Sequence, residues 1–475
     1  MNTKALRQKV LDLAIHGKLV PQNPNDESAT VLLEKIRAEK AEKIKKGELK
    51  ADKKDSFIFV GSDKRHYEKF ADGSVKDIED EIPFELPDGW SWVRGSEIVS
   101  QMTSRKPTGD FFNYIDIDAI DNKKHKIKQP KKIKVSDAPS RASRELFSGD
   151  ILFSLVRPYL ENIAFISTEF ENCIASTGFF VCRPNGNIFP KYLYFLLISK
   201  YVISGLNEFM KGDNSPSISS DDIIKFFFPL PPLTEQQLIV AEIEKIFAQI
   251  DLLEQNKTDL QTAIKQAKSK ILDLAIHGKL VPQDPNDEPA EELLKRIATS
   301  DNRPYEKVED EPFEIPDSWR WVKLTSICNK LVDGDHNPPK SVEEQTEYIM
   351  ASSRNINYDR LDDLENVRYL SKEVFKIENN RTKAEKGDIF FTSVGTIGRS
   401  CIYSGDYNIC FQRSVTVLNT NINNQFLKYF FDSNFFQTYV IEHSTGTAQM
   451  GFYLKEMANS PDMLCHLSMT KQNLI

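Results

Sequence analysis

Apolar residues recur in alternating steps of four and three along residues 234–275. This apolar stripe consists of Ile239, Ile243, Ile246, Ile250, Leu253, Leu260, Ile264, Ala267, Ile271 and Leu274. Such steps keep apolar side chains on one narrow face of a helix, as in a coiled coil, and only Lys257 interrupts them. Thr234 and Gln237, which follow a Pro-Leu-Pro-Pro stop, predict a capping box at the helix start. At 1.5 Å per residue the helix would be roughly 60 Å long, which favours a coiled-coil spacer over a single core helix.

The chain contains two copies of one pattern. Residues 11–27, LDLAIHGKLVPQNPNDE, return at 272–288 with a single change, from Asn23 to Asp284. Further segments recur in the same order: HYEK (66–69) and PYEK (304–307), IPFELPDGWSWV (82–93) and EPFEIPDSWRWV (311–322), SGDILFSLV (148–156) and KGDIFFTSV (386–394), KYLYFLLIS (191–199) and QFLKYFFDS (425–433). Copies this far apart belong to domain-sized units. The sequence predicts an α+β chain of two related domains of mixed α/β character, and such a chain is suited to a target with two similar parts.

Between these shared segments the two halves diverge. The stretch that begins YIDIDAIDNKKHK at residue 114 matches the one that begins YIMASSRNINYDR at residue 348 only in its opening Tyr-Ile. Constant frames around variable inserts are typical of a binding module whose copies recognise different targets. The first copy also contains extra residues in the Lys/Glu-rich segment 38–55, which we interpret as an extended helix end or a linker.

Several repeated residues have structural interpretations. His16 and His277 precede Gly17 and Gly278, where each helix should end, and this arrangement favours helix capping over catalysis. The four tryptophans form one pair at the start of each domain, where we expect them to anchor the core: Trp90 with Trp92, and Trp319 with Trp321.

Composition limits the alternatives. The 475 residues carry a net charge of -8, and no stretch is long and apolar enough for a membrane helix. Residues 101–160 are locally basic, with twelve Lys and Arg against seven Asp and Glu, and a local basic patch attracts phosphate even on an acidic protein. The six cysteines form no CxxC pair, which fits a reducing cytoplasm. Cys173 and Cys182 share their spacing with Cys401 and Cys410, which we interpret as buried strand cysteines in equivalent places rather than a metal site.

The sequence lacks recognisable catalytic motifs. It contains no GxGxxG loop after a strand, no GxxxxGK[ST] phosphate loop and no HExxH. The segment Asn337–Lys340 is similar to the Asn-Pro-Pro-aromatic loop of amino-methyltransferases, but Lys340 replaces the aromatic residue that would stack on the target base. We therefore interpret this segment as a turn and the chain as non-catalytic.

The repeated LDLAIHGKLVPQ, PDGWSWV with PDSWRWV, GDILFS with GDIFFT, and PLPPLTEQQLIVAEIEKIF together resemble the specificity subunits of type I restriction-modification systems. The resemblance covers nearly the whole chain. It implies two target-recognition domains in pseudo-twofold duplicated halves, separated by long conserved coiled-coil helices, each reading one half of a bipartite site in double-stranded DNA. It implies two modification subunits and restriction/motor subunits as partners in the cytoplasm, with S-adenosylmethionine, Mg²⁺ and ATP used by those subunits and no cofactor in this chain. The expected boundaries are 1–66 (N-terminal helical region), 67–232 (first recognition domain), 233–304 (central helical spacer), 305–461 (second recognition domain) and 462–475 (tail).

The candidates for DNA contacts are chosen by motif position and side-chain chemistry, because Arg can form two hydrogen bonds with guanine, and Asn or Gln can form two with adenine. In the first domain the candidates for base contacts are Arg105, Lys106, Arg157, Tyr159, Lys211 and Asn214. In the second domain they are Asp335, His336, Lys340, Arg354, Asn355, Arg399, Gln412 and Arg413. The candidates for phosphate contacts are Lys124, Lys126, Lys131 and Lys132. The alternative for each is an ordinary surface or turn residue.

The tail departs from the family pattern. After LKEMANSP, where a second PLPPLTEQ-like turn and helix should follow, the chain reads DMLCHLSMTKQNLI, without a capping box or a heptad. We expect a truncation near Pro461, which would leave the apolar stripe without its intramolecular partner and open to pairing with residues 234–275 of a second chain. Two other functions stay open: a silent or decoy specificity cassette, and a methyltransferase or nuclease in its own right.

Overall fold

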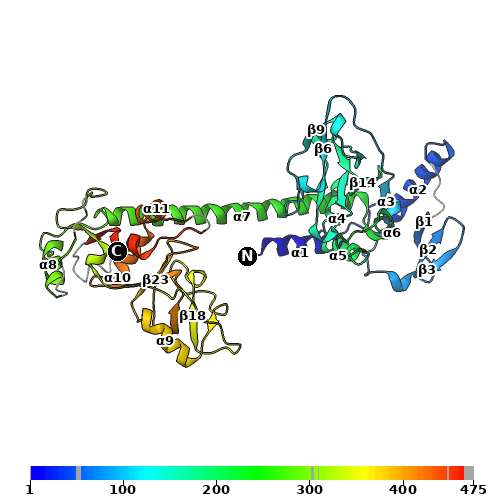
Figure 1. Cartoon of the computed structure of the whole chain (residues 1–475). Helices are drawn as coiled ribbons and strands as arrows, with labels where there is room; N and C mark the ends of the chain where they lie inside the picture. The colour runs from blue at the N-terminus through cyan, green and yellow to red at the C-terminus, as the bar shows by residue number, and fades with distance from the viewer. Residues whose placement is uncertain are drawn as a thin grey trace. The chain divides into compact units, whose positions relative to one another are not determined.

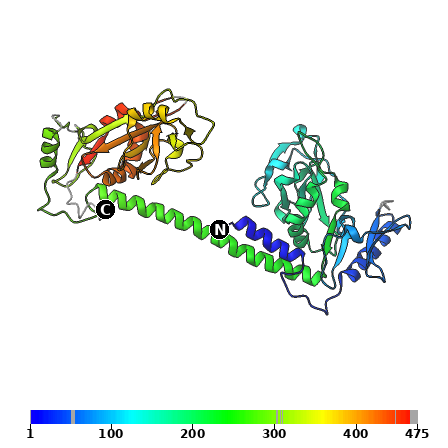
Figure 2. The same cartoon turned by 90° about the horizontal axis from the view of Figure 1, so that it is seen from below.

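A computed structural model describes residues 2–49, 55–300, 304–306, 308, 310–446 and 449–464. Residues 50–54 of the expected linker, Lys307 of the second HYEK-like segment and residues 465–475 of the expected tail lie outside this description. The chain divides into two compact units, one ending at Lys257 and one beginning at Thr258. Figures 1 and 2 show each unit as a mixture of helices and strands, as the α+β assignment requires.

Unit 1 begins with a helical frame. Helix α1 (Thr3–Ile15) runs antiparallel to the first half of α7 (Leu233–Ile276), and both views show them side by side. Val10, Leu11, Ala14 and Ile15 of α1 are buried in the core of the unit. The Arg7 guanidinium lies 2.6 Å from the Asp251 carboxylate and 4.9 Å from the centre of the Phe247 ring. Burial of one face and this charged contact on the other hold α1 on α7.

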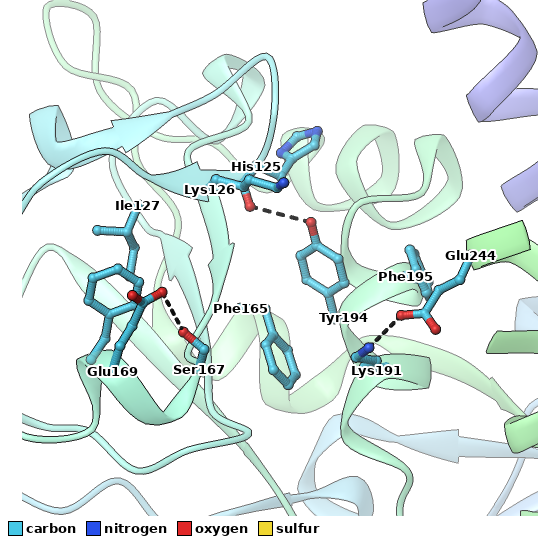
Figure 3. A pocket seen from close by; sticks show the side chains of 11 residues that line it. His125, Lys126, Ile127, Phe165, Ser167, Glu169, Lys191, Tyr194, Phe195 and Glu244 are labelled. Carbon is cyan, nitrogen blue, oxygen red and sulfur yellow. Dashed lines mark hydrogen bonds and ion pairs between the residues drawn. The ribbon is translucent and has the colours of Figure 1, made fainter. Parts of the chain in front are cut away.

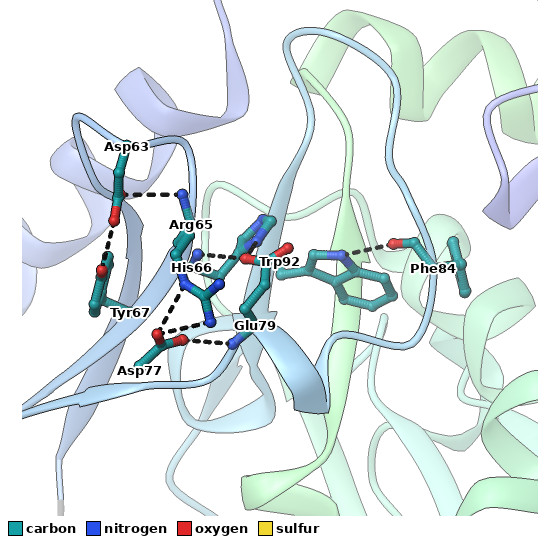
Figure 4. Close-up of polar contacts among 8 residues, drawn as sticks. All are labelled: Asp63, Arg65, His66, Tyr67, Asp77, Glu79, Phe84 and Trp92. Carbon is teal, nitrogen blue, oxygen red and sulfur yellow. Dashed lines mark hydrogen bonds and ion pairs between the residues drawn. The ribbon is translucent and has the colours of Figure 1, made fainter.

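The shared segments form the base of unit 1. Helix α2 (Ala29–Lys45) precedes a small sheet in the order β1 (Ser56–Val60), β2 (His66–Phe70), β3 (Val75–Asp77). Ion pairs along this sheet, including Arg65 with Asp77 at 2.8 Å, tie its strands together (Figure 4). Strand β4 (Ser91–Arg94), which carries Trp92, pairs with β15 (Phe227–Leu230) and so brings the two ends of the recognition domain together.

The variable part of unit 1 consists of strands and short helices between β4 and β15. One sheet has the order β10 (Ala142–Glu145), β13 (Ile174–Ser176), β6 (Phe111–Ile115), β9 (Lys131–Lys134). Another has the order β12 (Ile163–Phe165), β11 (Ile151–Ser154), β14 (Phe179–Pro184), β5 (Val99–Ser100), and β7 (Ile120–Asp121) pairs with β8 (Lys126–Ile127). The helices are α3 (Gly95–Ile98), α4 (Pro190–Leu197), α5 (Lys200–Asn207) and α6 (Ser220–Lys225).

Unit 2 repeats this plan. Helix α8 (Ala290–Ser300) corresponds to α2, and the pair β16 (Arg320–Lys323) with β24 (Pro461–Leu464) corresponds to β4 with β15. One sheet has the order β17 (Cys328–Asp333), β23 (Val415–Thr420), β20 (Ile389–Thr392), β21 (Ser400–Ile402), and the other the order β19 (Arg368–Tyr369), β18 (Tyr348–Ala351), β22 (Asn408–Phe411). The helices are α9 (Lys372–Thr382), α10 (Asn424–Asp432), α11 (Asn434–Glu442) and α12 (Leu454–Asn459). The duplicated sequence therefore encodes a duplicated topology.

The capping and anchoring residues behave as their positions indicate. His16 is the C-cap of α1, and Gly17 follows in a left-handed conformation with φ of 63°. Gly278 has φ of 65° after His277. The Trp92 indole donates to the Phe84 carbonyl at 3.2 Å (Figure 4), and Trp321 donates to the Phe313 carbonyl at 3.1 Å in the equivalent place. These predictions are confirmed.

Two sequence interpretations are wrong. Thr234 is not the N-cap of the long helix, because α7 already begins at Leu233 and the Thr234 hydroxyl donates to the Asp26 carboxylate at 2.6 Å. The cysteines are buried, but their shared spacing does not reflect equivalent places. Cys182 in β14 lies opposite Ile151 of β11, whereas Leu418 lies opposite the equivalent Ile389 of β20, and Cys401 lies in β21.

The apolar stripe is buried only along its first part. Ile239, Ile243 and Ile250 pack in unit 1, whereas Leu253, Leu260, Ile264 and Ile271 each expose about half of their surface or more. Among the helices that the structure describes, none combines the length and the apolar character that a membrane crossing needs.

Candidate nucleic-acid interface

In unit 2 a polar groove opens where two parallel strands end. Strands β18 and β22 run side by side in parallel and end at Ala351 and Phe411. The Gln412 N–H donates to the Ala351 carbonyl at 3.0 Å, and the Ser353 N–H donates to the Ser414 hydroxyl at 3.1 Å. These bonds hold the two following loops next to each other. The groove has a volume of about 600 Å³ and is lined by Ser341, Met350, Ser352, Ser353, Arg354, Asn355, Asn366, Val367, Arg368, Val394, Gln412, Arg413, Ser414 and Gln449.

The groove contains arginines that have no ion-pair partner within the described part of the chain. Most arginines that the structure describes have a carboxylate oxygen within 4.0 Å of a guanidinium nitrogen, as do Arg94 with Glu68 and Arg183 with Asp150. The exceptions among the described arginines are Arg144, Arg157, Arg354, Arg368, Arg399 and Arg413. Three of these exceptions line the groove. Unpaired guanidinium groups beside amide and hydroxyl side chains suit an anionic, hydrogen-bonding ligand.

Arg354 and Arg413 are exposed at the groove, and a side chain that contacts DNA has to be exposed. Arg368 is half-buried, and its Nη1 donates to the Pro339 carbonyl at 2.8 Å. Sequence reasoning found Arg354, Gln412 and Arg413 but missed Arg368 and Gln449. Arg368 lies in a two-residue strand within the variable insert, where no motif marks it.

Asn355 lines the groove but does not present its amide there. The residue is 2% exposed, its Oδ1 accepts the Ser352 N–H at 3.0 Å, and its Nδ2 donates to the Asp363 carbonyl at 2.9 Å. Because both ends of the amide are occupied, Asn355 cannot make the bidentate base contact expected from its type. This residue instead fixes the loop that carries Arg354.

The remaining candidates of unit 2 do not line the groove. The Asp335 carbonyl accepts the Arg413 N–H, and the Asp335 carboxylate accepts the Asn337 N–H at 2.8 Å, so Asn337–Lys340 begins as a turn. His336 is bonded to Asp333 at 2.6 Å, and Lys340 is exposed. Arg399 is half-buried over the ring of Tyr358 at 5.8 Å.

The carboxyl groups of Asp335 and Glu378 interact with each other in unit 2. Burial and the neighbouring Asp335 raise the pKa of Glu378 to about 7. Asp335 keeps a pKa below its usual range, chiefly because its carboxylate accepts the Asn337 N–H. Glu378 is therefore close to half-protonated at neutral pH.

In unit 1 the corresponding region carries Arg157, Lys211 and Asn214. The Leu155 N–H donates to the carbonyl of Gly178, which follows β13, and the Ile218 N–H donates to the Leu155 carbonyl. The hairpin between Lys211 and Ser217 thus lies against the loop after β11, and the Arg157 Nη2 donates to the Asn214 carbonyl at 3.1 Å. Tyr159 is exposed in the same loop.

The structure does not bring all candidates of unit 1 together. The Arg105 Nη2 donates to the Asn172 carbonyl at 3.3 Å, near the start of β13, whereas Arg157 lies near the end of that strand. Lys106 is an exposed neighbour of Arg105. Lys131 and Lys132 lie on β9, at the edge of its sheet, and Lys124 and Lys126 lie on the β7–β8 hairpin, all exposed. Exposed lysines on a sheet edge and a hairpin suit contacts to phosphate, but Lys131 is already paired with Asp118 at 2.5 Å.

A cavity in unit 1 differs from the groove of unit 2 because aromatic side chains form part of its wall. It has a volume of about 330 Å³ and lies between the β7–β8 hairpin, α4 and α7, with Phe165, Tyr194 and Phe195 among its lining residues (Figure 3). The Tyr194 hydroxyl donates to the His125 carbonyl at 3.3 Å, and Lys191 forms an ion pair with Glu244 across the rim. Aromatic side chains form part of its wall, and polar side chains, including Lys126, Ser167 and Glu169, line the rest.

Comparison with known proteins agrees with this architecture. Residues 87–262 match the family model described as the type I restriction modification DNA specificity domain. The EcoAI specificity subunit of a type I restriction enzyme from Escherichia coli is 32% identical over 399 residues, which cover 69% of this chain and 63% of that protein. The EcoEI specificity subunit, also from Escherichia coli, is 28% identical over 84% of this chain and 74% of that protein. The chain is therefore similar to specificity subunits of type I restriction enzymes.

The structural likeness extends over both units. A solved chain from work on complex assembly and conformational transition of the type I R-M system aligns with a TM-score of 0.57 and 23% identity, over 82% of this chain and 90% of that chain. This likeness shows a common fold. The chain spans 63% of the length of the EcoAI specificity subunit.

Proposed function

We propose that this chain is a specificity subunit of a type I restriction-modification complex, a non-catalytic DNA-recognition subunit in which each unit reads one half of a bipartite site. The observation that supports this most directly is the groove of unit 2. There, Arg354, Arg368 and Arg413 lie beside Gln412 and Gln449, and none of the three arginines has a carboxylate partner among the residues that the structure describes. Arginine can bind guanine through two hydrogen bonds, and glutamine can bind adenine in the same way. Lysines on β9 and the β7–β8 hairpin add contacts to phosphate.

The proposed partners follow from the same function. The chain would act in the cytoplasm and dock two modification subunits, and restriction/motor subunits would join this complex. S-adenosylmethionine, Mg²⁺ and ATP would be used by those subunits, while this chain itself takes no cofactor.

A homodimer is an alternative arrangement that we propose beside reading by both units of one chain. Leu253, Leu260, Ile264 and Ile271 form an exposed apolar face on α7, and the heptad spacing of this face suits an antiparallel pairing with α7 of a second chain. Such pairing would remove these side chains from water and present a matching pair of units to a palindromic bipartite site.

The test is a selection of bound DNA. The chain is reconstituted with its modification subunits, without methyl donor, and mixed with duplexes that contain a random central segment. Bound duplexes are then recovered and sequenced. We expect enrichment of a bipartite motif with two fixed halves and a constant gap. Recovery of unenriched sequence by a complex that assembles and binds DNA would overturn the proposed function.

A further inference from the structure

Equivalent loops of the two units differ at two backbone positions. In unit 1 the loop after β11 contains Arg157, three residues after the strand ends, and Glu161, two residues before β12 begins. In unit 2 the loop after β20 has Gly395 and Gly398 at these same two places relative to β20 and β21. All four residues have positive φ: 48° and 58° in unit 1, 88° and 89° in unit 2.

The left-handed backbone is open to glycine and unfavourable for residues with a Cβ atom. Unit 2 therefore has glycine, which this backbone conformation favours, at both positions. Unit 1 has Arg157 and Glu161 there, although the conformation is unfavourable for them. Strain of this kind persists where a side chain is needed.

Glu161 has a structural reason for its place. Its Oε1 lies 3.1 Å from the Lys4 Nζ on α1, and its Oε2 lies 3.7 Å from the His125 Nε2. The Asn122 side chain donates to the neighbouring Leu160 carbonyl at 2.9 Å. Glu161 thus ties the loop to α1 and to the β7–β8 hairpin.

Arg157 has no comparable partner within the described chain. Its backbone N–H donates to the Pro216 carbonyl at 2.7 Å and its Nη2 donates to the Asn214 carbonyl at 3.1 Å, but no carboxylate pairs with the exposed guanidinium. The backbone bond and the bridge between Val156 and Ser217 hold the loop still. The guanidinium is therefore presented from a fixed backbone with hydrogen-bond donors left over for a ligand.

Unit 2 uses the equivalent space differently. A Cβ atom on Gly395 would lie 3.2 Å from the Ser353 hydroxyl and 3.5 Å from the Gln449 amide, both of which line the groove. A side chain at this position would lie against two residues of the groove, and unit 2 has glycine there.

We propose that Arg157 is a specificity-determining residue of unit 1 and that its guanidinium reads a guanine in the major groove of the first half-site. This inference rests on the proposed function, because it names the residue that reads one base of that site. A bidentate contact to the guanine O6 and N7 would use the planar fork of arginine, which lysine lacks.

The test uses Arg157→Gly, Arg157→Lys and a control, Glu161→Gly, in the reconstituted complex with modification subunits. Arg157→Gly removes the guanidinium while relaxing the backbone, so it should fold at least as well as the wild type. Glu161→Gly relaxes the same loop and removes its contacts to Lys4 and His125 but keeps the guanidinium. Bound duplexes are selected from a random pool and sequenced, and thermal unfolding is recorded for each variant.

We expect both Arg157 variants to lose the preference for guanine at one position of the first half-site, by about 5- to 150-fold. The second half-site should be unchanged in them, and Glu161→Gly should select the wild-type motif. Three results would overturn the inference: an unchanged motif in both Arg157 variants, weaker binding to all sequences with the same motif, or the same relaxation in Glu161→Gly. If the wild type selects no motif at all, the proposed function itself fails, and that result is distinct from the other three.

Discussion

The Arg413 N–H donates to the carbonyl of Asp335 at 2.8 Å. This bond joins the loop after β22 to the loop after β17, and it brings the Asp335–Glu378 carboxyl pair next to an arginine of the groove. The charge on that pair therefore bears on any ligand that Arg413 binds.

DNA binding by unit 2 should weaken as the pH rises from 6 to 8. The pKa of Glu378 is raised to about 7 from an ordinary value of 4.5, so a rise in pH adds a second negative charge beside Asp335 and the incoming phosphates. The folded chain also keeps a proton on Glu378 that the unfolded chain releases, so stability falls between about pH 4.5 and 7 and levels off above that. Fluorescence anisotropy with duplexes that carry the selected motif measures the affinity.

Glu378→Gln is the matched control for this pH dependence. The variant isolates the contribution of Glu378, and we expect it to flatten most of the affinity change between pH 6 and 8. An unchanged pH profile in Glu378→Gln would assign the effect to other groups.

Arg354→Ala and Arg413→Ala should each weaken recognition of the second half-site. Loss of a bidentate base contact reduces discrimination by about 1–3 kcal/mol, and loss of a phosphate contact lowers the salt dependence of binding by about one ion. Arg360→Ala is the control, because Arg360 is a surface arginine of the same unit that already lies 3.6 Å from the Asp362 carboxylate. Binding titrations at several salt concentrations separate the two effects, and equal losses in all three variants would argue against the groove.

Leu260→Lys combined with Ile264→Lys should abolish the proposed homodimer. These side chains are 62% and 48% exposed on the apolar stripe of α7, and a charge in the middle of a coiled-coil face opposes pairing. Leu252→Lys is the control, since Leu252 is 60% exposed but lies off the stripe. Sedimentation velocity of the chain with its modification subunits reports the number of copies; a wild-type complex with one copy would rule the homodimer out.

Gly17→Ala should destabilise unit 1 more than Gly73→Ala. Both glycines have positive φ, but a Cβ atom on Gly17 would lie 2.4 Å from the Pro87 Cγ, whereas one on Gly73 would meet no atom within 4 Å. The left-handed conformation alone costs roughly 1–2 kcal/mol in each variant, and overpacking typically adds about 1–3 kcal/mol for Gly17. Urea unfolding with Trp fluorescence measures the difference, and equal losses would show that Pro87 moves away freely.

The fold was largely predictable because both copies repeat the residues that dictate local structure. Gly17 and Gly278 end equivalent helices, and Trp92 and Trp321 make equivalent hydrogen bonds to the chain eight residues before them. The start of α7 was not predictable, because Thr234 is bonded to Asp26, more than two hundred residues away in the sequence.

The candidate site was predictable only in part. Arg354 and Arg413 were found by residue type in the variable segments, but type alone could not tell that Asn355 is buried. Arg368 reaches the groove because β19 pairs with β18. A strand of only two residues leaves no recognisable pattern in the sequence, so this pairing could not be predicted. The sequence does not show that Arg157 has a left-handed backbone conformation at the position where unit 2 has Gly395.

Base-resolution mapping of methylated DNA, from cells that express this chain with its modification subunits, tests the central claim most directly. The account predicts that adenines are methylated within one bipartite motif, with two fixed halves and a constant gap. Two different halves would show both units at work, and a palindrome would show a homodimer that uses the same unit twice. The absence of any motif, in cells where the chain assembles with its modification subunits, would contradict the account.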